Sequence, residues 1–149
     1  MISAKTFAAS LSLAAALAAM PLAPVDAGNA RLAASGPFRI DKIHYRQGVT
    51  LNSEYIVIKN VTARRHRLTG FRVVDRQDGQ RYRFPRTILG AGHSVVLHTG
   101  HGQNNPGDRY WNRDAPVWNN DGDTALLKNR SAVVVDRCSY PGGDTTAYC

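Results

Sequence analysis

Cysteine and long apolar runs are both scarce in this sequence of 149 residues. The longest apolar segment, Phe7–Met20, has 14 residues, whereas a membrane-spanning helix needs about 20. Pro21 and Pro24 follow it, and no cysteine stands beyond them where a lipid anchor would require one. No later stretch has a long helical period, so we expect neither a membrane span nor a helical fold.

Motifs of catalysis are also missing. No serine stands in a G-x-S-x-G elbow, and no general base with an orienting carboxylate accompanies His93, His98 and His101 at a recognisable spacing. We therefore expect no enzyme, no metal and no cofactor. The weak alternative is a metal-dependent enzyme, in which His98 and His101 approach one another with Asp108 nearby.

Lysine is the rarer of the two basic residues. Only four of the 19 Lys and Arg residues are Lys, and with 11 acidic residues the net charge is +8. Arginine presents planar, bidentate donors suited to carboxylates and phosphates, which favours acidic partners. A GC-rich genome would produce the same bias, and this second interpretation carries equal weight.

The N-terminus is typical of an export signal. Lys5 precedes the apolar segment, and Val25 and Ala27 supply the small residues that signal peptidase needs, so we expect cleavage after Ala27 and a secreted protein. About 122 residues remain, which suffices for one domain. Apolar residues at 43% and charged residues at 20% are typical of a globular chain. The expected organisation is a signal at 1–27, a lead-in at 28–36 and one domain at 37–149.

That domain consists of short runs with alternating apolar residues, separated by Gly, Pro, Asn and Asp. Asp78-Gly79 lies between two such runs and predicts a hairpin. Pro85 ends the second of them because it cannot donate to a ladder, and Asn60 can cap an earlier strand through its side chain. The seven predicted strands lie at 38–45 (at a sheet edge), 55–58, 71–74, 81–84, 94–97, 124–127 and 132–135.

Seven short strands joined by tight turns predict an all-β fold, namely an antiparallel β-sandwich. A closed OB-type barrel is the alternative. The longest irregular stretch, 99–120, is either functional or packed as a structured loop.

The two cysteines, Cys138 and Cys149, are 11 residues apart, and Pro141-Gly142-Gly143 between them allows the chain to reverse. In an exported protein such a pair is usually a disulfide. We expect a structural disulfide that fixes the C-terminus.

Six segments occur in an order that carries a family resemblance. They lie at 52–60 (NSEYIVIKN), 68–75 (LTGFRVVD), 82–85 (YRFP), 89–97, 118–127 and 133–136. In this order the chain resembles the lamin tail domain over about residues 37–138. The resemblance implies an immunoglobulin-like antiparallel β-sandwich that binds or scaffolds without catalysis, and the cysteine pair resembles that of exported bacterial versions. We expect a monomer whose partner is a protein or a cell-envelope polymer.

Arginines concentrate between residues 64 and 86 and suggest another partner. The alternation Arg81-Tyr82-Arg83-Phe84 places two arginines on one strand face, and Arg72 lies on the hairpin partner. An arginine stripe would contact a nucleic acid or other polyanion without reading sequence, and a solvated surface is the other interpretation. The predicted polyanion-binding residues are Arg64, Arg65, Arg67, Arg81 and Arg83.

Two further segments have alternative interpretations. Residues 119–124 (NNDGDT) suggest a calcium loop, but the closing Glu is missing, so we expect a turn with Asx side chains bonded to the backbone. Tyr110, Trp111 and Trp118 suggest an aromatic platform for sugars or bases. A sandwich of this size needs large core residues, so we expect Trp118 to be packed and Trp111 partly so.

Overall fold

The computed structural model describes residues 36–46 and 48–149. The expected signal at 1–27 and nearly all of the lead-in lie outside these residues. The described part contains eleven strands and one short 3₁₀ helix. None of its helices has the length and apolar character needed to cross a membrane.

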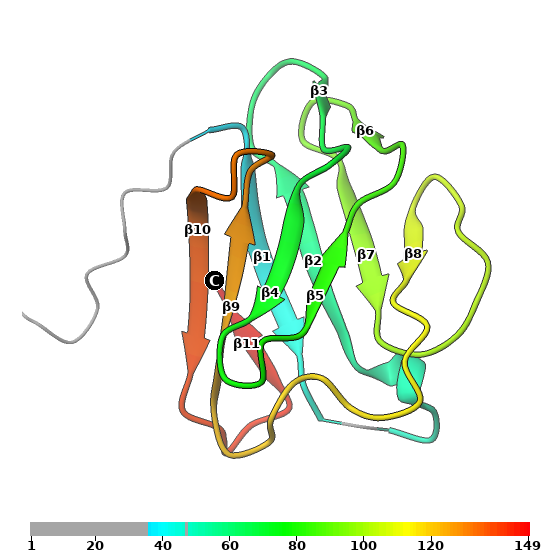
Figure 1. Ribbon diagram of the computed structural model, residues 1–149, viewed down its shortest axis with the longest axis vertical. Helices are drawn as coiled ribbons and strands as arrows, with labels where there is room; N and C mark the ends of the chain where they lie inside the picture. The colour runs from blue at the N-terminus through cyan, green and yellow to red at the C-terminus, as the bar shows by residue number, and fades with distance from the viewer. Residues whose placement is uncertain (1–35, 47) are drawn as a thin grey trace, which may run out of the picture. The chain divides into compact units, whose positions relative to one another are not determined.

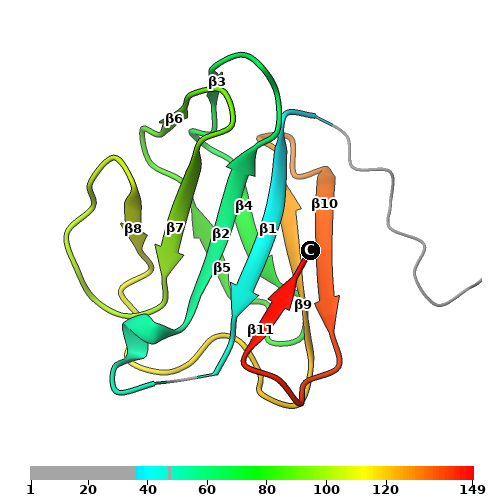
Figure 2. The same ribbon diagram turned by 180° about the vertical axis from the view of Figure 1, so that it is seen from behind.

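The strands form two larger sheets and one small one. The five-stranded sheet has the order β11-β1-β2-β7-β8, the four-stranded sheet β10-β9-β4-β5, and the small sheet pairs β3 with β6. The two larger sheets lie face to face (Figures 1 and 2). Their elements are β1 (Phe38–His44), η1 (Leu51–Ser53), β2 (Tyr55–Asn60), β3 (His66–Arg67), β4 (Arg72–Asp75), β5 (Arg81–Arg83), β6 (Ile88–Leu89), β7 (Ser94–His98), β8 (Asp108–Tyr110), β9 (Asp123–Lys128), β10 (Val134–Tyr140) and β11 (Thr146–Tyr148).

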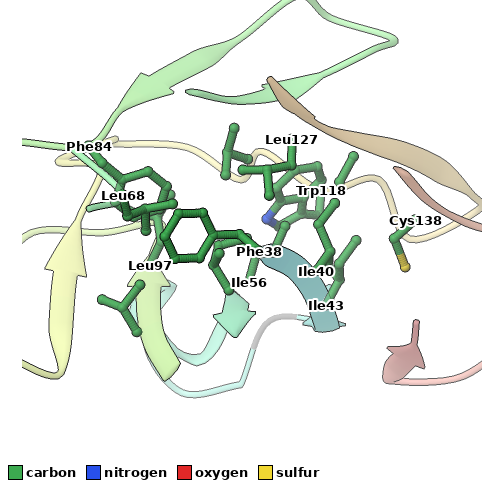
Figure 3. Packing of buried hydrophobic residues seen from close by; sticks show 14 of the residues in the cluster. Phe38, Ile40, Ile43, Ile56, Leu68, Phe84, Leu97, Trp118, Leu127 and Cys138 are labelled. Atoms are coloured by element: carbon green, nitrogen blue, oxygen red, sulfur yellow. The ribbon is translucent and has the colours of Figure 1, made fainter. Parts of the chain in front are cut away.

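Alternation along the strands builds the core. In β9 every second residue is buried, and β1 and β7 have nearly the same pattern. Because successive side chains of a strand point to opposite faces, each of these strands contributes one apolar face to the space between the sheets. Figure 3 shows the resulting cluster around Trp118, with Phe38, Ile56 and Leu127 among its members. The all-β sandwich is thereby confirmed, and the closed barrel is not formed.

The first strand is not at a sheet edge, contrary to expectation. The C-terminal strand β11 pairs antiparallel with β1, and β2 pairs with its other side. The sequence of β11 is too short to stand out as a strand. The Cys138–Cys149 disulfide, which the structure confirms with a Cα–Cα distance of 5.6 Å, links the residue after β11 to β10.

One strand pair is parallel, and it involves β8, which was not among the seven predicted strands; the pairs among those seven are antiparallel, as expected. Residues 99–107 leave β7 and cross over to bring β8 beside it in the same direction. Parallel neighbours need such a crossover, which a two-residue turn cannot provide. The long stretch 99–120 is therefore a structured segment with a strand of its own.

The last predicted strand begins later and runs further than expected. Ala132 has a positive φ of 64° and belongs to a turn closed by hydrogen bonds to Asn129, so β10 begins only at Val134. It then continues through Cys138 to Tyr140.

Two contacts join the sheets directly. Asp136 of β10 accepts a hydrogen bond of 2.7 Å from the backbone N–H of Ile40, at the bulge between Ile40 and Lys42 in β1. The disulfide joins Cys138 on β10 to Cys149, which follows β11. Both contacts connect β10, an edge strand of the four-stranded sheet, with the β11–β1 side of the five-stranded sheet.

Candidate functional site

The outer face of the four-stranded sheet gathers basic side chains. In β4 the buried residues Val73 and Asp75 point inward, so Arg72 points outward. Arg72 lies opposite Arg83 of β5 and opposite Lys128 of β9. In the neighbouring row, Arg81 of β5 and Arg137 of β10 lie at the two outer strands. We call these five residues, Arg72, Arg81, Arg83, Lys128 and Arg137, the basic face.

Among the described residues, no carboxylate forms an ion pair with the basic face. The three acidic residues on these strands, Asp75, Asp123 and Asp136, are buried between the sheets. Within the described part of the chain, none of the five cations forms an ion pair, and the buried Nε of Arg137 has no hydrogen-bond acceptor. The face therefore carries an uncompensated positive charge.

The five arginines predicted from the sequence are all exposed, but they lie on different sheets. Arg81 and Arg83 belong to the basic face. Arg67 lies on β3 of the small sheet, and Arg64 and Arg65 lie in the turn before it. The expected juxtaposition of Arg72 with Arg83 is present in the hairpin, whereas a polyanion-binding role for the predicted set stays a prediction.

Lys128 and Arg137 were missed by sequence reasoning. The alternation of β9 indicates an outward Lys128, but its pairing with β4 joins segments more than fifty residues apart. Arg137 lay beyond the predicted end of its strand. These two residues join the basic face only because β9, which lies far from β4 in the sequence, pairs with it in the sheet and because β10 then pairs with β9.

His98, at the end of β7, and His101, in the long segment, bind separate carboxylates. His98 Nε2 lies 3.0 Å from Asp108 Oδ1, and its Nδ1 lies 3.0 Å from the carbonyl of Asn52. His101 Nε2 lies 2.8 Å from Asp114. The hydrogen bond from His98 is the main cause that lowers the pKa of Asp108, and a hydrogen bond from the Asn105 side chain lowers it further. Within residues 36–46 and 48–149, no group of three or more His, Cys, Asp or Glu side chains is arranged to hold a metal ion.

The segment 119–124 is a turn of the expected kind. Asp123 accepts hydrogen bonds from the backbone N–H groups of Asn119 and Thr124. Burial, with a smaller contribution from the nearby Asp75, raises the pKa of Asp123 to about 6 against the effect of those hydrogen bonds. Two buried carboxylates thus lie close to one another between the sheets.

The tryptophans belong to the core. Trp118 is buried and Trp111 is half-buried, with their rings packed edge to face at 6.2 Å, as expected. Tyr110 stacks on His98 with ring centroids 5.0 Å apart. These contacts hold the rings against the protein instead of leaving an open aromatic platform.

Glu54 anchors the long segment at both ends, which sequence reasoning did not foresee. Its Oε1 accepts hydrogen bonds from the Thr99 hydroxyl and from the backbone N–H groups of Val117 and Trp118. The side chain is fully buried, and burial raises its pKa. A buried carboxylate with three donors fixes a segment that would otherwise have few backbone partners.

Comparison with known proteins agrees with this architecture. Residues 32–142 match the family model of the Lamin Tail Domain. The match covers most of the chain, which therefore belongs to that family. No curated protein matches the chain significantly.

Proposed function

We propose that this lamin tail domain is an exported, non-catalytic binding module that holds an anionic cell-envelope polymer on its basic face. The observation that carries the proposal is the row Arg83, Arg72 and Lys128, three cations directly opposite one another on adjacent strands. Like charges in such positions destabilise a sheet, by a few tenths of a kcal/mol to about 1 kcal/mol per pair. A bound polyanion would remove that cost.

The chemistry of the face defines the partner. Arginine forks bind carboxylate and phosphate groups bidentately, and adjacent strands about 4.8 Å apart present such forks at regular intervals. A sheet face with its charges unpaired favours a repeating anion over a single small ligand. Binding of this kind depends on phosphate or carboxylate groups and releases counterions, so it should weaken steeply with salt.

Two observations support export. The N-terminal segment has the organisation of a secretory signal, and the structure contains a disulfide between Cys138 and Cys149. Disulfides persist in oxidising compartments outside the cytosol. The polymer would then be one that the secreted domain meets in or beyond the cell envelope.

The test measures binding of the mature protein to fluorescently labelled polygalacturonate, polyphosphate and a short DNA duplex across a range of salt concentrations. The variant Arg72→Gln/Arg83→Gln/Lys128→Gln removes the row. The matched control, Arg64→Gln/Arg65→Gln/Arg67→Gln, removes three exposed cations from β3 and the turn before it, outside the basic face. Since each lost contact lowers the salt slope by about 1, the row variant should bind at least tenfold more weakly with a flatter slope.

The outcomes separate three interpretations. Strong loss in the row variant with little loss in the control supports the proposal. Equal loss in both variants would mean that total charge alone governs binding, and absence of binding by the wild-type protein at low salt would end the proposal. Tighter binding to DNA than to both other polymers would assign the face to nucleic acid instead.

A further inference from the structure

A second basic site lies apart from the basic face, where the chain leaves β5. A groove of about 520 Å³ runs between the segment that connects β5 to β6 and the loop that leads into β8. Both views show these two segments next to one another (Figures 1 and 2). The polar residues that line the groove are Arg86, Asn104, Asn105 and Arg109, and none of its lining residues is acidic.

Arg109 supplies fixed positive charge at the base of the groove. It is only 6% exposed, and its guanidinium donates to the Thr87 hydroxyl and to the backbone carbonyls of Arg86, Asn105 and Asp108. All of these acceptors are neutral. The adjacent Asp108 carboxylate hydrogen-bonds to His98 and also interacts with the charge of Arg109, without forming an ion pair with it in the described residues. Since all the hydrogen bonds of this buried cation go to neutral groups, Arg109 still contributes a positive potential to the groove.

The two asparagines are oriented by the loop that leads into β8. Asn104 Oδ1 accepts the backbone N–H of Tyr110 at 3.0 Å, and Asn105 Oδ1 accepts those of Gly107 and Asp108 at 2.9 Å each. The Asn105 side chain also hydrogen-bonds to the Asp108 carboxylate, so its amide is engaged on both sides. Because its oxygen is engaged, Asn104 presents its Nδ2 group as a donor, and this group has no acceptor in the described part of the chain.

Arg86 completes the donor set. Its side chain is exposed and forms no ion pair in the described residues, while its backbone carbonyl is bound by Arg109. The backbone of Arg86 is therefore held in place, and its guanidinium is available to bind a ligand. The groove then offers the donors of Arg86 and Asn104 above the buried charge of Arg109, and a ligand rich in acceptors fits it.

The remaining walls are apolar. Pro85, Pro106 and Ile88 line the groove, and Ile88 is 43% exposed although it is a large aliphatic residue. Such walls suit the C–H face of a ring, and the volume lies within the range of small-molecule sites. We propose that the groove binds an acidic sugar unit, with its carboxylate or phosphate group at Arg86 and the Asn104 amide and its ring against the apolar walls.

The experiment is a titration of the ¹⁵N-labelled mature protein, followed by NMR, with glucuronate, glucose 6-phosphate, glucose and inorganic phosphate. Both acidic sugars should give saturable shifts confined to the backbone amides of residues 86–88, 104–105 and 107–109. The two acidic probes distinguish carboxylate from phosphate as the preferred group. Glucose should be at least tenfold weaker because it lacks the anion, and phosphate at least several-fold weaker than glucose 6-phosphate because it lacks the ring.

Two variants and a control locate the binding. Arg86→Gln and Ile88→Glu change exposed side chains, and each should weaken binding of the acidic sugars at least tenfold, the first by removing the cation and the second by adding a negative charge. Arg81→Gln on the basic face should leave it unchanged. Shifts elsewhere, equal affinity for glucose, equal affinity for inorganic phosphate and glucose 6-phosphate, or unaltered binding by Arg86→Gln would each overturn the inference. The variant Arg72→Gln/Arg83→Gln/Lys128→Gln should retain sugar binding, so the proposal for this groove and the proposal for the basic face are tested separately.

Discussion

The side-chain amide of Asn60 donates to the carbonyl oxygen of Gly90 at 2.7 Å, although 30 residues separate the two. The same Nδ2 group also donates to the carbonyls of Leu89 and Arg64, and Oδ1 accepts from the N–H and hydroxyl of Thr62. Asn60 is fully buried. One side chain thus joins the end of β2, the following turn and the end of β6.

Replacement of Asn60 by alanine should therefore be severe. Asn60→Ala leaves several buried carbonyl and N–H groups without partners, and each such group costs about 1–3 kcal/mol. We expect the free energy of unfolding, measured by urea denaturation, to fall by at least about 3 kcal/mol. Asn120→Ala, at an exposed turn position, is the control, and a loss of similar size there would show that the buried hydrogen bonds of Asn60 do not account for the effect.

The disulfide should stabilise the domain by holding β11 on β1. The chain-entropy model gives about 2.5 to 3 kcal/mol for a loop of this length, so Cys149→Ser should lower the melting temperature by on the order of 10 °C. Denatured wild-type protein should show no titratable thiol. The double variant Cys138→Ser/Cys149→Ser should melt at the same temperature with and without reductant, whereas the wild type should melt earlier with reductant.

The Asp75–Asp123 pair should make the protein more stable in mild acid. Asp123 has a pKa of about 6 in the folded protein against 3.8 as its ordinary value, so the folded state binds the proton more tightly. Its stabilising effect is complete below pH 3.8 and is lost as the pH rises through 6. The free energy of unfolding should thus be larger at pH 5 than at pH 7, by about 1 kcal/mol from this group.

The variant Asp75→Asn isolates that effect. Asp75 Oδ1 accepts the N–H groups of Gln77 and Asp78, while its buried Oδ2 has no donor. An amide nitrogen in place of Oδ2 would donate to the Asp123 carboxylate and remove the repulsion. Asp75→Asn should be more stable than the wild type at pH 7 and show a weaker pH dependence between 5 and 7. Asp78→Asn, an exposed carboxylate of the same turn, should keep the wild-type pH profile.

Ala132 occupies a backbone conformation that favours glycine, with φ at 64°. The left-handed region costs a residue with a Cβ about 1–2 kcal/mol, and glycine loses about 0.5–1 kcal/mol of that gain through its greater freedom when unfolded. Ala132→Gly should raise the free energy of unfolding by up to about 1 kcal/mol in urea denaturation. Ser131→Gly, one residue earlier and without a positive φ, should give no gain, and equal gains would remove this explanation.

Local pattern was sufficient for much of the fold. The alternation of β-branched and polar residues located β1, β2, β7 and β9, and Asp78-Gly79 located the hairpin, with Gly79 at a positive φ of 69°. The capping by Asn60 and the disulfide also followed from the residues alone. These features depend on neighbours in the sequence or on the chemistry of a single residue type, so they can be predicted from the sequence.

Strands without such a pattern were missed. β3, β6, β8 and β11 have two or three residues each, too few for alternation to be recognised. Their pairing is held by partners distant in sequence. β8, for example, is fixed by its parallel register with β7 and by Arg109, whose acceptors lie on two separate loops.

The amino-acid sequence by itself determined the fold class, the family, the hairpin that places Arg72 opposite Arg83, and the cysteine pair. Tertiary structure alone decided that Lys128 extends that pair into a row and that Arg109 lies beneath a groove without an ion-pair partner. The physical reason is that alternation fixes which face of a strand a side chain occupies, whereas the neighbours it meets there depend on which strands pair and in what register, and those pairings are settled by the burial of the common core.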